Sequence, residues 1–261
     1  MKSVTAAILL LAGAGSSLAI SWPLAFTVQG EITIPFAEIQ EPFLAYVDFP
    51  NKRSRIDYYG GMDQTYQRGD LGGESGIMFK IVPMVNNHLE SDLACFQVNG
   101  TKDAPVSAQS ILPDMTGFKN LGKDMLNGEE CEKWQKIDEV GDKVNKYTMW
   151  VKIIASTLNP KLNIAIPLHY EMKGFNSLLG SHYDHYYLTY RNFFPDPPQS
   201  SIFDEYQTHG KCGGMPGPGV SKVYHMNPAK EFVDHVDEHV DSAFEEFKAK
   251  HGKDYGSRKG A

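Results

Sequence analysis

The sequence contains little cysteine, has no excess of basic charge and lacks long apolar runs beyond its amino terminus. Its three cysteines are too few for a small scaffold held together by disulfides. Lys and Arg total 25 against 32 for Asp and Glu, so the net charge of −7 argues against binding nucleic acid through its phosphates. Motifs of serine hydrolases, phosphate-binding loops and dinucleotide-binding folds are also absent. We therefore expect a globular protein with neither a cofactor nor a nucleic-acid partner.

The amino terminus has the pattern of a secretory signal peptide over 1–19. Lys2 precedes an apolar run over 4–14, and Ser17 and Ala19 place small residues before a cleavage site. The run is shorter than the roughly 18–20 residues that a membrane-spanning helix needs, so we expect no membrane span. The mature chain should begin at residue 20 and be secreted or delivered to the lysosomal lumen.

Residues 20–209 are predicted to form an antiparallel β module. From about Phe43 to Tyr190, apolar side chains recur at every second position, which is typical of strands. Hairpins are expected where 43–49 meets 56–59, where 131–140 meets 143–153, and where 162–175 meets 182–191. The helical pattern in this part covers 107–126; because Pro113 and Gly117 interrupt it, it predicts at best a short helix and a loop.

Consecutive hairpins without intervening helices favour a curved antiparallel sheet, or half-barrel, which must cover one face. Its interior is expected to be either a packed core, which the sequence favours, or a cavity for an apolar ligand. The predicted fold class is thus mainly β, followed by a carboxy-terminal amphipathic helix.

A Gly/Pro-rich segment over 210–226 is the predicted boundary of the β module. After it, Asn227 and Pro228 fit the first positions of a helix. Apolar side chains recur at three- and four-residue steps from Phe232 to Phe247, with acids and lysines between them. This spacing predicts an amphipathic helix of about five turns.

His235 and His239 are weak candidates for metal ligands on that helix. They are four residues apart and so share a face, with acidic side chains beside them. A helical zinc protease would carry glutamate directly after the first histidine, where this chain has Val236. We therefore expect no metal.

Secretion would place the three cysteines in an oxidising compartment, where one pair can form a disulfide and one thiol is left over. Cys95 and Cys131 are the favoured pair because both lie in strand-like runs. Cys212, in the Gly/Pro-rich stretch, is the alternative partner for either of them or for another chain. Asn99 begins the sequence's one Asn-x-Ser/Thr sequon, at an expected turn, and is a predicted glycosylation site. Residues 68–70 form an Arg-Gly-Asp tripeptide, a weak adhesion motif in an expected loop.

Residues 244–255 (FEEFKAKHGKDY) resemble the opening of the inhibitory prosegment of papain-like cysteine proteases, the cathepsin propeptide inhibitor domain. The resemblance makes Phe244, Phe247 and Tyr255 the expected anchors of a partial prosegment over 227–261. It implies a papain-like catalytic domain as partner, in cis in a longer precursor or in trans. The family's next helix and its catalytic domain do not occur within these residues, so a truncated form is expected.

The order of segments resembles that of the insect two-chain cathepsin-like proteinases, known as 26/29 kDa proteinases. These combine a signal peptide, a β module like the one containing residues 46–61 (YVDFPNKRSRIDYYGG), a Pro-Gly-Pro-Gly linker and a prosegment. The β module also resembles LolA-like and ependymin-like half-barrels, which are associated with hydrophobic ligands.

No position matches the protease family's nucleophile, base or orienting residue, so no catalytic residue is expected. The sequence predicts a non-catalytic, secreted part of a cysteine proteinase precursor. The alternative is a stand-alone secreted protein that binds lipid or another hydrophobic small molecule.

Overall fold

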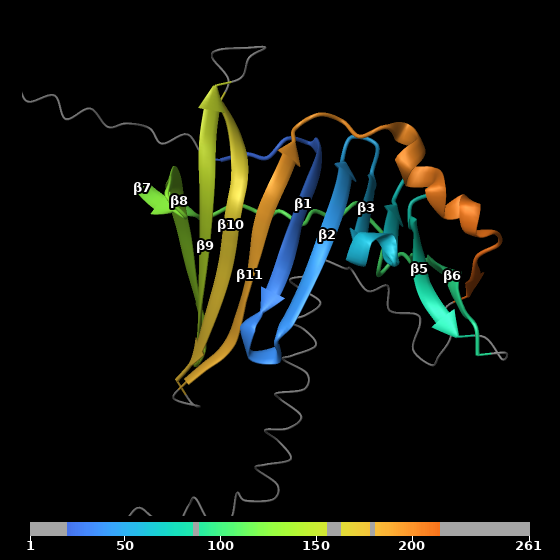
Figure 1. The fold of residues 1–261 in the computed structure, drawn as a ribbon, viewed down its shortest axis with the longest axis horizontal. Helices are drawn as coiled ribbons and strands as arrows, with labels where there is room; N and C mark the ends of the chain where they lie inside the picture. Colours follow the sequence, from blue (N-terminus) through green and yellow to red (C-terminus); the bar gives the residue numbers. More distant parts are fainter. Residues whose placement is uncertain (1–19, 86–88, 156–162, 178–180, 215–261) are drawn as a thin grey trace, which may run out of the picture.

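The computed structural model describes residues 20–85, 89–155, 163–177 and 181–214. In these residues, twelve strands form one open sheet in the order β12-β6-β5-β4-β3-β2-β1-β11-β10-β9-β8-β7 (Figure 1). All neighbouring strands are antiparallel except β12, which runs parallel to β6. The prediction of a mainly β protein with an antiparallel sheet is confirmed. The predicted helix, prosegment and anchor residues over 227–261 lie outside the described residues.

The strands form two meanders, in each of which neighbours in sequence are neighbours in space. The first contains β1 (Ala25–Ile34), β2 (Ile39–Asp48), β3 (Arg53–Tyr58), β4 (Asp63–Arg68), β5 (Ile77–Val85) and β6 (Ser91–Asn99). The second contains β7 (Lys119–Leu126), β8 (Glu129–Val140), β9 (Lys143–Ala155), β10 (Asn163–Asn176) and β11 (Ser181–Phe194). The remaining elements are the short strand β12 (Gly213–Gly214) and the 3₁₀ helices η1 (Pro35–Ala37), η2 (Tyr59–Gly61) and η3 (Ser200–His209).

The three predicted hairpins are present as the pairs β2–β3, β8–β9 and β10–β11. Local hydrogen bonds fix the first of them. The Asp48 carboxylate accepts hydrogen bonds from Asn51 Nδ2 at 2.8 Å and from Arg53 Nε at 2.9 Å, across a turn in which Lys52 has a φ of 55°. An aspartate at the start of a turn commonly bonds in this way.

Pairing of β1 with β11 joins the two meanders into one sheet. The side of the sheet that carries Val28, Ile56, Met149 and Leu188 is called the inner face here, and the opposite side the outer face. The main core lies on the inner face. Its larger buried members are Phe26, Ile32, Phe43, Val47, Trp134, Val151, Tyr170, Met172, Tyr186 and Tyr190.

Residues 105–118, called the covering segment below, cross the inner face on the way from β6 to β7 (Figure 1). Ile111, Leu112 and Met115 of this segment are buried in the main core. The backbone oxygen of Pro113 accepts a hydrogen bond from Trp22 Nε1 at 2.8 Å. The inner face is therefore covered by the chain itself.

The helical pattern over 107–126 does not form a helix. Residues 119–126 are β7, and the rest of the pattern is the irregular covering segment. Asn127 and Gly128 have positive φ values of 51° and 84° and make the tight turn from β7 to β8. No helix forms because residues 119–126 pair with β8 across this turn, while the covering segment forms hydrogen bonds with residues of the sheet.

Candidate functional site: a clasp on the outer face

The outer face of β3, β4, β5 and β6 is covered by the end of the described chain (Figure 1). Helix η3, Cys212 and β12 lie there. We call residues 200–214, together with the Arg-x-Asp pairs at 55–57 and 68–70 beneath them, the clasp. Alternation along β3 places Arg53 and Arg55 on the outer face, and the pairing of β3 with β4 places Arg68 opposite Arg53. The strand pattern thus brings three arginines together beneath η3.

Arg55 and Arg68 bind in the same way. Each forms a two-point ion pair with the aspartate two residues later: Arg55 with Asp57 at 2.7 and 2.8 Å, and Arg68 with Asp70 at 2.8 and 2.7 Å. Both arginine side chains are under a tenth exposed. Two-point pairing of this kind fixes the guanidinium plane and is stronger than a single hydrogen bond.

The remaining guanidinium nitrogen of each arginine binds η3. Arg55 donates to the Ile202 carbonyl at 3.0 Å and pairs with the carboxylate of Glu205. Arg68 donates to the Phe203 carbonyl at 2.8 Å and to Asp204 at 2.6 Å. Two adjacent carbonyls and two adjacent acids of η3 are therefore held by arginines from two neighbouring strands.

Aromatic side chains complete the contact. The guanidinium of Arg53 lies 4.5 Å above the ring of Phe203, which is fully buried. Tyr206 stacks on Phe79 with 3.8 Å between ring centroids and meets Tyr66 edge to face at 5.5 Å. η3 is thus docked by both apolar burial and charge.

Burial and ion pairing act in opposite directions on the acids of the clasp. Burial raises the pKa of Asp57 above its usual value, although the Arg55 guanidinium offsets part of this effect. Burial also raises the pKa of Asp70, but hydrogen bonds and charge from Arg68 outweigh it, so the pKa of Asp70 lies below its usual value. Burial lowers the pKa of Arg55, but hydrogen bonds to Asp57 and Glu205 outweigh it, and the hydrogen bond to Asp70 raises the pKa of Arg68, so both arginines stay charged.

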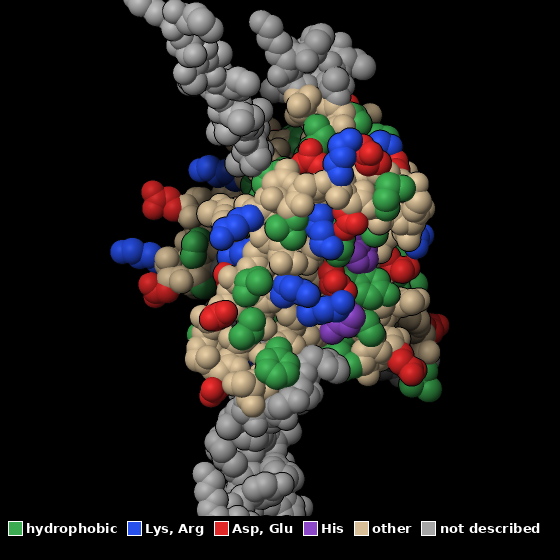
Figure 2. Space-filling model, turned by 90° about the vertical axis from the view of Figure 1, so that its left-hand side faces the viewer, with side chains coloured by type: hydrophobic (Ala, Val, Ile, Leu, Met, Phe, Trp, Pro, Cys, Tyr) green, Lys and Arg blue, Asp and Glu red, His purple; other side chains and the backbone are tan. Residues whose placement is uncertain are grey.

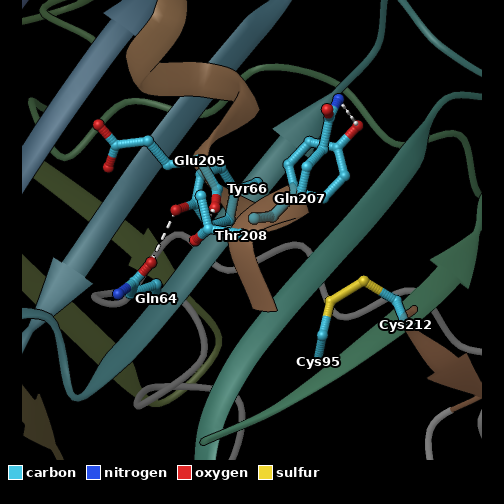
Figure 3. Close-up of a disulfide and its surroundings, with 8 residues drawn as sticks. Gln64, Tyr66, Cys95, Glu205, Gln207, Thr208 and Cys212 are labelled. Carbon is cyan, nitrogen blue, oxygen red and sulfur yellow. Dashed lines mark hydrogen bonds between the residues drawn. A yellow bond between two sulfur atoms is a disulfide. The ribbon is translucent and has the colours of Figure 1, made fainter. Parts of the chain in front are cut away.

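A disulfide between Cys95 of β6 and Cys212 closes the clasp (Figure 3). Next to it, β12 pairs with β6 through Gly213 and Phe96. The favoured pairing of Cys95 with Cys131 was wrong, and the alternative partner Cys212 is the one used. β6 and β8 lie near opposite ends of the sheet, so the two favoured cysteines cannot meet. Cys131 is a buried free thiol, and burial raises its pKa.

The Arg-Gly-Asp tripeptide belongs to the clasp: Arg68 is buried in it, while Asp70 lies in an exposed turn. The Arg68 side chain is 6% exposed and is engaged by Asp70 and by η3. An adhesion receptor would need this guanidinium free, so the contacts argue against the adhesion motif. By contrast, Asn99 of the sequon is exposed at the end of β6.

The outer face of β9, β10 and β11 carries a second group of polar and aromatic side chains. His185 Nε2 lies 3.0 Å from the Glu171 carboxylate, and His169 Nδ1 lies 3.2 Å from the hydroxyl of Thr189. Burial lowers the pKa of His169. Burial raises the pKa of Glu171, but hydrogen bonds from Lys173 and His185 outweigh it, so its pKa lies below the usual value. Figure 2 shows one side of the molecule, on which acidic, basic and histidine side chains are interspersed rather than gathered by sign.

Across the described ranges, no three His, Cys, Asp or Glu side chains come together in a way that could hold a metal ion. The weak candidates His235 and His239 lie outside those ranges. No helix in the described part of the chain is long and apolar enough to cross a membrane. Sequence reasoning missed the clasp, although its two Arg-x-Asp pairs, at 55–57 and 68–70, are visible in the sequence.

Comparison with known proteins gives no match: neither a protein-family model nor a curated protein sequence matches this chain.

Proposed function

We propose that this chain is a non-catalytic, secreted part of a papain-like cysteine proteinase precursor, in which the β module carries the start of an inhibitory prosegment. The observation that carries this proposal is the pattern of residues 244–255, with Phe244, Phe247 and Tyr255 at the expected anchor positions. The partner is a papain-like catalytic domain, in cis or in trans.

The clasp supports this proposal by fixing the point at which the chain leaves the β module. Ion pairs to η3 and the disulfide at Cys212 hold residues 200–214 against β3–β6. Any segment beyond Gly214 is therefore joined covalently to the sheet at β6 as well as through the backbone. In a precursor, this arrangement anchors the prosegment to a rigid neighbour.

Secretion with removal of residues 1–19 is part of this proposal and rests on the signal-peptide pattern of the sequence. Ile20 and Trp22 pack against the main core, and Trp22 holds the covering segment through Pro113. A mature chain that begins at Ile20 keeps both of these residues. Amino-terminal sequencing of protein from the medium should read from Ile20, and a start more than a few residues later would contradict this cleavage.

A peptidase assay tests the absence of catalysis. The purified secreted chain should show no turnover that the cysteine-protease inhibitor E-64 blocks, whereas a papain-like enzyme assayed alongside should be inhibited. E-64-sensitive turnover by the chain would overturn the proposal. Transcripts that continue past the codon for Ala261 into a prosegment and a Cys-Gly-Ser-Cys-Trp sequence would establish the parentage.

The alternative function, binding of lipid or another hydrophobic molecule, has the inner face of the sheet as its natural site. Ile111, Leu112 and Met115 of the covering segment occupy that face. A ligand would have to displace them, so their burial argues against this alternative. Native mass spectrometry of protein from its own cells discriminates the two, because a carrier should retain a bound apolar mass.

A further inference from the structure

Gln67 of β4 is an unusual residue on the inner face. Its side chain is only 1% exposed, yet neither its amide nitrogen nor its amide oxygen has a hydrogen-bond partner among the described residues. The amide oxygen of Gln109, in the covering segment, is also buried without such a partner. Burying an amide without a hydrogen bond is costly, so native structures rarely leave one in this state.

Both glutamines lie next to Ser54. The pairing of β3 with β4 places Ser54 directly opposite Gln67 on the inner face. From the other side, the backbone N–H of Gln109 donates to Ser54 Oγ at 2.9 Å. The Gln67 side chain and the backbone of Gln109 therefore both lie beside Ser54, where the covering segment meets β3 and β4.

We propose that Gln67 and Gln109 bind at least one ordered water molecule between the covering segment and the sheet. Water matches the groups to be satisfied, because it both donates and accepts, while the two amides together offer donors and acceptors. Gln67 is buried too completely for a larger ligand to reach it without moving the covering segment. The bound water then contributes to holding that segment on the inner face.

A surface pocket of about 260 Å³ lies beside this place, and Lys52, Gly69, Val106 and Ala108 are among its lining residues. Gly69 lies just past the end of β4, two residues after Gln67, and Ala108 precedes Gln109. A Cβ atom at Gly69 would lie 2.9 Å from the Lys52 carbonyl oxygen and 3.2 Å from that of Val106, so there is no room for a side chain at this position.

The test compares the full secreted chain with Gln67→Met, which keeps the length and shape of the side chain but removes its amide. Gln40→Met is the matched control, because Gln40 is exposed on β2. Oxygen-17 magnetic relaxation dispersion of the solvent counts long-lived waters in each protein. We expect Gln67→Met to lose about one such water and the control to lose none. Gln67→Met should be no more stable than the wild type, so its unfolding equilibrium constant should not fall.

If the amide were instead unsatisfied, Gln67→Met would keep the wild-type dispersion. It would also be more stable, because it removes a buried amide without partners, and its unfolding equilibrium constant would fall by roughly tenfold. That pair of results would overturn the proposal. A stoichiometric small molecule detected by native mass spectrometry in the wild type, but not in Gln67→Met, would also overturn it by assigning the site to a polar ligand. If Gln67→Met does not fold, the same measurements are made on Gln67→Leu. Loss of a long-lived water would again support the proposal, and unchanged dispersion with a gain in stability would overturn it.

Discussion

Removing the Cys95–Cys212 disulfide is the most direct perturbation of the clasp. The two cysteines are 117 residues apart in the sequence, so the crosslink closes a long loop in the unfolded chain. The chain-entropy relation gives about 5 kcal/mol for a loop of this length, and measured losses after removal of native disulfides are about 2–5 kcal/mol. For the double variant Cys95→Ala/Cys212→Ala, we expect the free energy of unfolding to fall by about 3–5 kcal/mol.

Urea unfolding followed by circular dichroism measures this loss. Cys131→Ala is the matched control, because Cys131 is buried but free and lies at the other end of the sheet. Wild type and Cys131→Ala should both lose stability when a reductant is added, and the double variant should not respond to it. A double variant within about 1 kcal/mol of the wild type would refute the reasoning. It would mean that the ion pairs alone hold η3, or that the unfolded chain gains little freedom.

Three further changes test the fold. Arg55→Met leaves the buried Asp57 unpaired and should cost about 3–5 kcal/mol in urea unfolding, whereas Arg191→Met, at an exposed ion pair, should cost less than about 1 kcal/mol. Gly100→Ala places a methyl group 1.8 Å from a backbone oxygen and should greatly reduce the yield of folded protein while keeping the sequon. Because burial lowers the pKa of His169, the unfolded chain takes up its proton first, so stability should fall as pH drops below about 6.5. His169→Gln should flatten that slope in unfolding measured between pH 7.5 and 5.

The hairpins could be predicted because their information is local. Alternation along 131–153 and the Gly141–Asp142 turn specify β8 and β9 without reference to the rest of the chain. The same holds for β10 and β11, where long runs of aromatic and β-branched side chains alternate. The expectation of a helix before β8 failed even though a local signal was present. Asn127-Gly128 is a strong hairpin turn, and its effect reaches back over 119–126.

The disulfide could not be predicted because it depends on the order of strands. Alternation tells which face of a strand a cysteine occupies, but not which strand lies beside it. Both Cys95 and Cys131 lie in strands, yet the connection over 100–118 carries the chain from one end of the sheet to the other. Cys212 lies beside β6 because η3, which precedes it in the chain, docks on Arg55 and Arg68.

The two proposed functions make different demands on the covering segment. With Ile111 and Leu112 in the main core, that face contributes to the stability of the module, which suits a rigid anchor for a prosegment. A ligand carrier requires the same segment to leave the sheet, giving up both the apolar burial and the hydrogen bond from Trp22 to Pro113. Trp22→Phe removes that hydrogen bond and keeps an aromatic ring, although a smaller one, against the main core. If the inner face has a role in ligand binding, this change should increase uptake of an apolar fluorescent probe; an anchor should show lower stability without new uptake.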